Sequence, residues 1–250
     1  MKLTFLFCSI TVALSACISM TLADPTTSQS AAVKIVIVGD STVCNYPAKR
    51  PDRGWGMFIE ERFKPGTVQV VNLAAAGRST KTFIEEGRWG KALDEKPQYI
   101  LIQFAHNDSH DPKNHEATNA ATDYKANLRR YIDETRAIGA TPILVTPMVR
   151  RDFDTDGKIR EGQPTGNLRA YADAMKEVGI EKKAPVTDLY TSSKALAEKI
   201  GPEASGKMAN KKGDITHFNQ TGARAMADLV MGELPTVAPA LGELLAAKSR

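Results

Sequence analysis

The stretch Val33-Lys34-Ile35-Val36-Ile37-Val38-Gly39-Asp40-Ser41-Thr42 decides the fold of this chain. Its β-branched apolar run is typical of a strand that is buried on both faces, as the strands of parallel sheets are. The run stops at Gly39, and glycine tolerates the backbone angles of a sharp turn. Ser41 is therefore expected at the carboxyl end of a strand, where open α/β sheets bind their ligands. At that place it is either a nucleophile or a helix N-cap.

The rest of the chain alternates between short β-rich runs and helical stretches. Because strands that alternate with helices form parallel sheets covered on both faces, this pattern predicts a three-layer α/β/α fold. Five strands fit a flavodoxin-like strand order. The predicted strands cover residues 33–38, 68–73, 99–104, 142–146 and 185–189, and the predicted helices cover 54–63, 82–94, 123–138, 168–178, 192–200 and a last segment from about Asn219.

Composition favours one globular domain, since 42% of the 250 residues are hydrophobic and 25% are charged. A net charge of +4 gives no case for nucleic acid as a partner. We expect a monomer that needs no cofactor. No metal site is expected either, because the histidines of the loop at 109–118 are irregularly spaced. Outside the first 23 residues Cys44 is the one cysteine, so no internal disulfide is expected.

Residues 1–23 differ from the rest, with Lys2 as their single charge and an apolar stretch after it. This pattern is typical of a secretory signal peptide. Leu14-Ser15-Ala16-Cys17 resembles a lipobox, in which Cys17 becomes a lipidated first residue, whereas Thr21-Leu22-Ala23 fits an ordinary signal peptidase. Residues 24–32 are predicted to be a linker and 33–250 the folded domain. Either cleavage predicts an exported protein, periplasmic or extracellular, that touches a membrane only through a lipid on Cys17.

Loops that follow parallel strands meet at one edge of the sheet, and here they carry residue types with complementary chemistry. A serine hydroxyl is a weak nucleophile until a histidine takes its proton, and that histidine needs an acceptor on its other nitrogen. Ser41, His217 and Asp214 supply these three parts. An oxyanion formed by attack on an ester would need donors, and the amides of Ser41 and Gly77 with the side chain of Asn107 can supply them.

The same blocks resemble the SGNH, or GDSL-like, hydrolases. Position 43 is valine, so the serine is not in the α/β-hydrolase elbow, which needs a glycine there. Within the family the similarity is to the rhamnogalacturonan acetylesterases and spans residues 34 to 232. It is carried by Gly39-Asp40-Ser41-Thr42, Gly54-Trp55-Gly56, Gly77-Arg78-Ser79-Thr80, Gln103-Phe104-Ala105-His106-Asn107-Asp108 and Asp214-Ile215-Thr216-His217-Phe218-Asn219.

The resemblance implies that Ser41 is the nucleophile, His217 the base and Asp214 its orienting acid. Ser41, Gly77 and Asn107 would form the oxyanion hole. The chain departs from the family at Ala105, where a glycine is usual, and we expect a modest change of loop geometry there.

Three further residues are candidates for holding substrate. Arg78 and Arg150 can bind a uronate carboxylate, and Trp55 can stack on a sugar ring. Surface ion pairs for the two arginines and a packing role for Trp55 are the alternatives.

These expectations describe a serine esterase that removes O-acetyl groups from a plant-type polysaccharide of the rhamnogalacturonan or pectin kind. Two alternatives stay open. The first is a related esterase that acts on acetylxylan, a lipid or a thioester. The second is a carbohydrate-binding surface protein that keeps the fold without catalysis.

Overall fold

The computed structural model describes residues 31–162 and 167–247, together with Met1. Apart from Met1, the predicted signal peptide with Cys17 lies outside the described residues, as does most of the predicted linker. The first strand begins at Val33, the first residue of the predicted domain. In the part of the chain that the structure describes, no helix has the length and apolar character needed to cross a bilayer.

Five parallel strands form one sheet in the order β2-β1-β3-β4-β5, with β1 inside it. This is the flavodoxin-like order, so the predicted fold class is confirmed. The strands are β1 (Val33–Gly39), β2 (Val68–Asn72), β3 (Tyr99–Gln103), β4 (Thr141–Val145) and β5 (Val186–Thr187).

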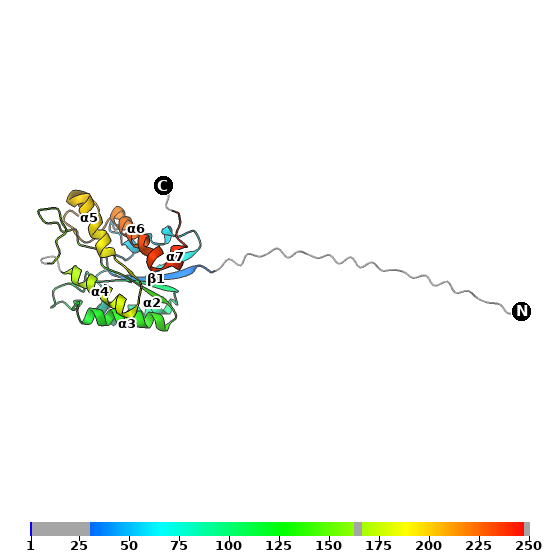
Figure 1. Ribbon diagram of the computed structural model, residues 1–250. Coiled ribbons are helices and arrows are strands. Elements are labelled where there is room, and N and C mark those ends of the chain that lie inside the picture. Colours follow the sequence, from blue (N-terminus) through cyan, green and yellow to red (C-terminus); the bar gives the residue numbers. More distant parts are fainter. Residues whose placement is uncertain (2–30, 163–166, 248–250) are drawn as a thin grey trace. The chain divides into compact units, whose positions relative to one another are not determined.

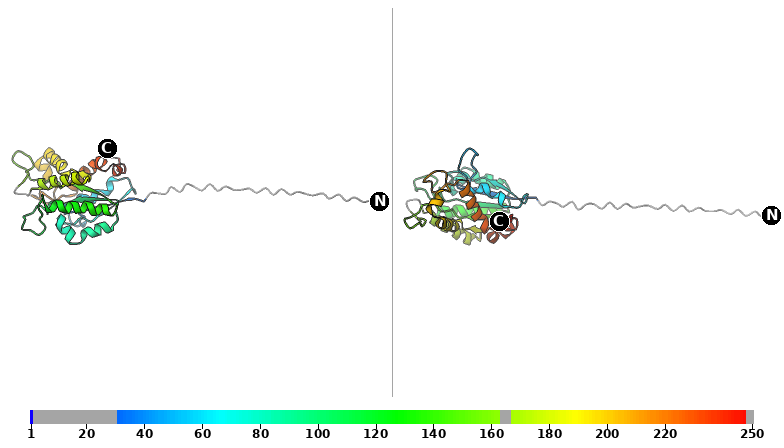
Figure 2. Two further views of the ribbon diagram at one scale, coloured as in Figure 1. Left: turned by 60° about the horizontal axis from the view of Figure 1, so that its bottom comes forward. Right: turned by 90° about the horizontal axis from the view of Figure 1, so that it is seen from above.

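Helices cover both faces of the sheet, and each face has its own apolar core (Figures 1 and 2). One core packs α1 to α4 against alternate residues of the strands, among them Val36 and Ile100. The other packs the first 3-10 helix, α6 and α7 against the opposite face, which includes Ile35 and Ile37. The helices are η1 (Trp55–Phe58), η2 (Glu60–Arg62), α1 (Thr80–Glu85), α2 (Arg88–Asp94), α3 (Asp123–Ala137), α4 (Leu168–Lys182), α5 (Leu189–Gly206), α6 (Gln220–Val237) and α7 (Pro239–Gly242).

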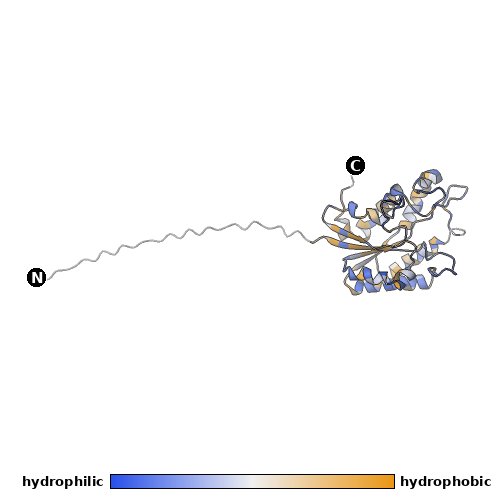
Figure 3. Ribbon diagram, turned by 180° about the vertical axis from the view of Figure 1, so that it is seen from behind, coloured by the Kyte–Doolittle hydropathy of each residue, from blue (hydrophilic) through white to orange (hydrophobic). Residues whose placement is uncertain are grey.

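The apolar strands lie between helices whose other faces are hydrophilic (Figure 3). This agrees with the prediction of strands that are buried on both faces.

The elements differ from their predicted bounds where glycine or a polar cap intervenes. Residues 54–63 form two short 3-10 helices instead of one helix. Gly54, just before the first of them, packs against the backbone of Val43 and Cys44 without room for a Cβ. Gly87, at a φ of +69°, separates α1 from α2 within the segment 82–94 that was predicted to be helical. Helix α5 starts at Leu189, earlier than predicted, because the Asp188 carboxylate caps its first turn through the Thr191 amide.

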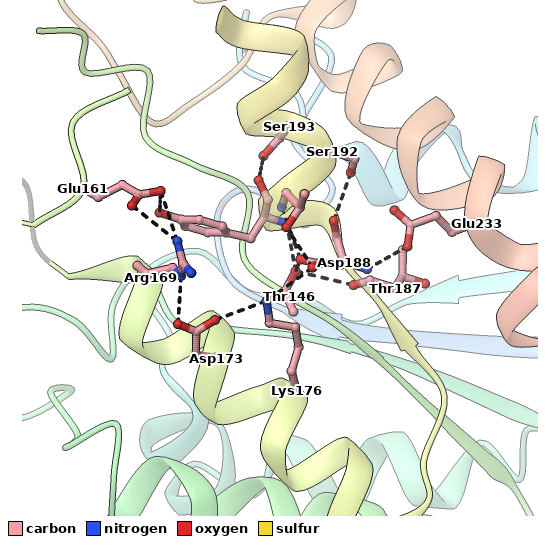
Figure 4. Close-up of polar contacts among 12 residues, drawn as sticks. Thr146, Glu161, Arg169, Asp173, Lys176, Thr187, Asp188, Ser192, Ser193 and Glu233 are labelled. Atoms are coloured by element: carbon pink, nitrogen blue, oxygen red, sulfur yellow. Dashed lines mark hydrogen bonds and ion pairs between the residues drawn. The ribbon is translucent and has the colours of Figure 1, made fainter. Parts of the chain in front are cut away.

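A polar cluster fastens the β5 edge of the sheet to α4 and α5 (Figure 4). The Thr146 hydroxyl, just after β4, donates to Asp188 at 3.2 Å and accepts from the Tyr190 amide at 2.8 Å. Asp188 also forms an ion pair with Lys176 at 3.3 Å, and its backbone amide donates to Glu233 of α6 at 2.8 Å. These bonds hold the ends of β4 and β5 at the edge where the candidate residues lie.

Candidate active site

Ser41 lies in a tight turn directly after β1. No helix follows it; the Asp40 carboxylate instead accepts from the amide and the hydroxyl of Thr42, at 2.9 and 2.7 Å, which makes an Asx turn. Asp40 is fully buried, and its side chain also lies 3.4 Å from the imidazole of buried His106. Burial works against the carboxylate, but His106 and the bonds from Thr42 hold the pKa of Asp40 below its usual value. The turn is thus fixed from inside the protein by an ionised side chain.

Gln103 and Trp55 complete this buried support. The Gln103 side-chain oxygen accepts from the Trp55 indole at 2.9 Å and lies 3.1 Å from the Thr42 hydroxyl oxygen. Trp55 has no exposed surface. This corrects the expectation that Trp55 stacks on a sugar ring, since its ring faces the core beneath the serine turn.

The structure brings Ser41, His217 and Asp214 together from opposite ends of the domain. The Ser41 Oγ lies 3.1 Å from His217 Nε2, and His217 Nδ1 lies 3.0 Å from Asp214 Oδ2. The other Asp214 oxygen accepts from the amides of Thr216 and His217, at 2.9 and 2.8 Å. Partial burial opposes ionisation of Asp214, yet these amides and the imidazole hold its pKa below the usual value. An ionised Asp214 fixes the proton of His217 on Nδ1 and leaves Nε2 to accept from Ser41.

The His217 side chain is 40% exposed, so a substrate can reach the pair from solvent. The relay therefore has an accessible hydroxyl, a base and an orienting carboxylate in hydrogen-bond contact. Its geometry suits nucleophilic attack on an ester carbonyl.

Gly77 and Asn107 lie on two loops that touch each other. Gly77 adopts a φ of +79°, which favours glycine, and its Cβ position is open. The Asn107 side-chain amide donates one hydrogen to the carbonyl of Arg78, the residue after Gly77, at 3.0 Å. An amide NH₂ carries a second hydrogen, which can serve an oxyanion.

Ala105 is strained where the sequence departs from the family pattern. It is fully buried and has a φ of +133°, a backbone conformation that residues other than glycine rarely adopt. The strain sits two residues before Asn107. The loop therefore accepts the methyl group of Ala105, while the backbone of this residue keeps a conformation that suits glycine.

Asp108 locks the same loop to α1. It is fully buried and accepts from the Thr80 amide at 3.1 Å and from the Thr118 hydroxyl at 3.0 Å, in addition to the Thr80 hydroxyl. Burial raises the pKa of Asp108 to about 7 despite these bonds. Asp108 was placed in a motif by sequence, but its use as a cross-link between two loops was not predicted.

The two arginines after β4 contact different halves of the site. Arg150 is half-buried and donates to the His106 carbonyl at 3.1 Å, and burial lowers the pKa of its guanidinium. Arg151, which the sequence reasoning missed, is 7% exposed and donates from Nη2 to the carbonyls of Asp214 and His217, at 2.9 and 2.7 Å. Its guanidinium stacks on Phe218 at 4.3 Å, and burial lowers its pKa to about 10, so it stays charged at neutral pH.

Arg78, the other candidate for holding a carboxylate, is already paired. Its Nε donates to both oxygens of Glu86, at 3.1 and 3.0 Å, and its side chain is 34% exposed. A uronate would have to compete with Glu86 for this guanidinium. In the described ranges, residues 31–162 and 167–247, there is no group of three or more His, Cys, Asp or Glu side chains that could hold a metal ion.

Comparisons with known proteins show which family the chain resembles. Residues 37–225 match the model of the GDSL-like lipase/acylhydrolase family. The chain is 35% identical over 201 residues to YesY of Bacillus subtilis, a probable rhamnogalacturonan acetylesterase, covering 78% of this chain and 89% of that one. It is also 35% identical over 213 residues to the rhamnogalacturonan acetylesterase RhgT of the same species, covering 79% and 88%.

Solved structures share the fold. The crystal structure of YxiM from Bacillus subtilis superposes with a TM-score of 0.70 at 31% identity, over 81% of this chain and 56% of that one. Axe2, an acetylxylan esterase from Geobacillus stearothermophilus, gives a TM-score of 0.65 at 19% identity, over 82% and 95%. At that identity the likeness to Axe2 concerns the fold alone.

Proposed function

The chain belongs to the GDSL-like lipase/acylhydrolase family and is a carboxylic ester hydrolase; from this premise we propose that it removes O-acetyl groups from an acetylated polysaccharide of the rhamnogalacturonan kind. The observation that carries the chemistry is the continuous relay from the Ser41 hydroxyl through His217 to Asp214, at 3.1 and 3.0 Å. The substrate class is supported by the two relatives from Bacillus subtilis that are 35% identical and carry that name.

The proposed reaction has two halves. Ser41 Oγ attacks the acetyl carbonyl while its proton passes to His217 Nε2, and the oxyanion binds to the amides of Ser41 and Gly77 and to the side chain of Asn107. The sugar oxygen leaves with the proton from His217, and the acetyl group stays on Ser41. Water then attacks this ester, gives one proton to His217, and releases acetate as Ser41 recovers its hydrogen.

The nucleophile is tested with Ser41→Ala. Activity on a small acetate ester should fall by about 10⁴-fold or more, because the residues of such a relay act as a unit, while the circular dichroism spectrum stays the same. Asn45→Ala, on the same loop but outside the relay, is the matched control. Unchanged turnover in Ser41→Ala would remove the serine as nucleophile and would favour the non-catalytic alternative.

The substrate is tested by acetate release from acetylated rhamnogalacturonan, homogalacturonan and xylan, together with chromogenic esters of increasing chain length. We expect the first of these to be preferred and acetate to be preferred over longer acyl groups. A preference for xylan, or for long acyl chains, would contradict the proposed substrate and favour the other esterases.

We also propose that the protein is exported, since residues 1–23 have the pattern of a signal peptide and polysaccharides of this kind lie outside the cell. Mass spectrometry of the mature amino terminus distinguishes the two processing routes. A diacylated Cys17 supports the lipid anchor, a free Asp24 supports ordinary cleavage, and an intact Met1 contradicts export.

A further inference from the structure

Two surface loops, residues 45–53 and 207–213, are attached directly to the proposed catalytic residues. The Tyr46 hydroxyl of the first loop donates to the carbonyl of Ser41 at 2.9 Å. In the second loop, the Lys211 carbonyl accepts from the Asp214 amide at 3.0 Å. Each loop is therefore joined by a hydrogen bond to a residue of the relay.

The first loop is bonded both to the residue after His217 and to the second loop, although more than 150 residues separate the loops in the chain. The Arg53 amide donates to the carbonyl of Phe218, the residue after His217, at 2.9 Å. The Asn210 side chain reaches Asp52 at 3.3 Å. Together the loops make one continuous border beside the relay, which we call the basic rim.

The basic rim carries more net positive charge than the whole chain does. The whole chain has 33 basic and 29 acidic residues and a net charge of +4. Asp52 is the single acidic residue of the two loops, and it stands against six basic ones: Lys49, Arg50, Arg53, Lys207, Lys211 and Lys212. The positive excess of the chain is thus gathered at the candidate site and is not spread evenly over the surface.

Much of this charge is open to a ligand. Lys49, Lys211 and Lys212 are exposed, and none of the described residues forms an ion pair with them. Arg50 pairs with Asp52 at 3.1 Å, and Lys207 pairs with Glu203 at 2.7 Å. Exposed cations within about 10 Å of an approaching anion act on it at moderate ionic strength and are screened at high salt.

We propose that the basic rim binds the uronate carboxylates of an acidic polysaccharide on either side of the acetylated sugar, so that it selects acidic over neutral acetylated chains. The proposal rests on the proposed function and deepens it. A row of cations beside a nucleophile attracts a polyanion and raises its local concentration, whereas a neutral xylan gains nothing from it. The nucleophile, base and oxyanion donors take no part in this selection, so a small neutral ester is hydrolysed without it.

The test compares Lys211→Gln/Lys212→Gln with the matched control Lys91→Gln/Lys96→Gln. The control also removes two exposed charges, one in α2 and one at the opposite edge of the sheet, just before β3. Each variant is assayed on acetylated rhamnogalacturonan, acetylxylan and 4-nitrophenyl acetate at about 20 mM and about 200 mM salt, since the Debye length shortens markedly over this range.

We expect the rim variant to lose about 5- to 10-fold in kcat/KM on the acidic polymer at low salt, mainly through KM, and to lose most of its salt dependence. Its activity on acetylxylan and on the small ester should match the parent, as should all activities of the control. Equal losses in the rim variant and the control, or an equal loss on all three substrates, would overturn the proposal.

A second measurement separates this proposal from the proposed function. Binding of unacetylated polygalacturonate to the Ser41→Ala protein needs no hydrolysis, so it reports on the rim even if the parent cleaves none of the polymers. We expect binding that weakens about 10-fold between the two salt concentrations and is reduced in the Lys211→Gln/Lys212→Gln background. No binding, or tighter binding of duplex DNA than of polygalacturonate, would overturn the assignment to uronates.

Discussion

Replacing Arg151 by methionine should slow catalysis without changing how a small substrate binds. One guanidinium nitrogen of Arg151 holds the carbonyls of Asp214 and His217, at 2.9 and 2.7 Å. The Arg151 amide also donates to the Ile215 carbonyl at 2.8 Å, so residue 151 fastens the turn that carries the proposed base and its acid. Methionine keeps the length of the stem and its contact with Phe218 but cannot donate.

The magnitude follows from these contacts. Hydrogen bonds from a charged donor contribute about 1.5 to 3 kcal/mol each, but Nε and Nη1 of Arg151 are buried without hydrogen-bond partners in the described residues, which already disfavours the buried charge. We therefore expect a net loss of about 1 to 2 kcal/mol in the free energy of unfolding. The freed turn can move His217 by a fraction of its 3.1 Å distance to Ser41, and a displacement of about 1 Å costs about 10²-fold in rate.

The assay is steady-state hydrolysis of 4-nitrophenyl acetate by folded protein, with thermal unfolding measured in parallel. We expect kcat to fall about 10²-fold, or about 2.7 kcal/mol, and KM to stay within about 3-fold. Arg224→Met is the matched control, because Arg224 stacks on Phe58 at 4.4 Å in the same way but makes no bond to the catalytic turn. Arg151→Lys should retain part of the rate, since a lysine reaches one carbonyl but not both. A kcat within 3-fold of the parent in Arg151→Met, or an equal fall in Arg224→Met, would refute the reasoning.

Three more outcomes follow from the buried parts of the site. Ala105→Gly should cost less than about 0.5 kcal/mol in unfolding free energy, because relief of about 1 to 3 kcal/mol of strain offsets the lost methyl group. The control Ala172→Gly in α4 should cost about 1.5 to 2 kcal/mol. Equal costs in urea titrations would exclude strain at residue 105. Asp108 has a folded-state pKa of about 7, above its ordinary value, so between about pH 4 and about pH 7 its carboxyl group is protonated in the folded protein but ionised in the unfolded chain. The folded protein therefore loses stability as pH rises through this window. In Asp108→Asn the fall in Tm across the window should be smaller than in the parent. Trp55→Phe should lower the unfolding free energy by about 1 to 2 kcal/mol and leave KM for polysaccharide unchanged, because the indole bonds Gln103 and not substrate; a raised KM would restore the stacking role.

The sheet was predictable because its signals are local. The runs that begin at Val33, Val68 and Tyr99 are apolar, β-branched and short, and each ends in a turn signal, so their existence and parallel order followed from alternation with helices. Their ends differ by one or two residues from the prediction, since hydrogen bonding with neighbouring strands sets where pairing stops. The two 3-10 helices were not predictable in this way. The close approach of Gly54 to the loop after Ser41 is a tertiary contact, which the local sequence does not indicate.

Side-chain direction was the harder part of the site. Ser41, Asp214 and His217 could be placed at one edge because strand ends and loops position them. Arg150 and Arg151 are adjacent in an extended segment, so they point to opposite sides, and the sequence contains no signal for which one faces the catalytic turn. For Trp55 the residue type fits both a sugar platform and a packing anchor, and only its burial decides between them.

The hydrogen bond between Ser41 and His217 joins positions 176 residues apart in the chain. Contacts of such high sequence separation form late in folding, because the intervening loop must close before they contribute any stability. β1 is also an inner strand, which must pair with β2 and β3 before the serine turn has its support. Hydrolysis of a chromogenic ester during refolding should therefore return after the far-ultraviolet helix signal. Activity therefore reports on the last stage of folding, and no amino-terminal fragment that ends before His217 can show it.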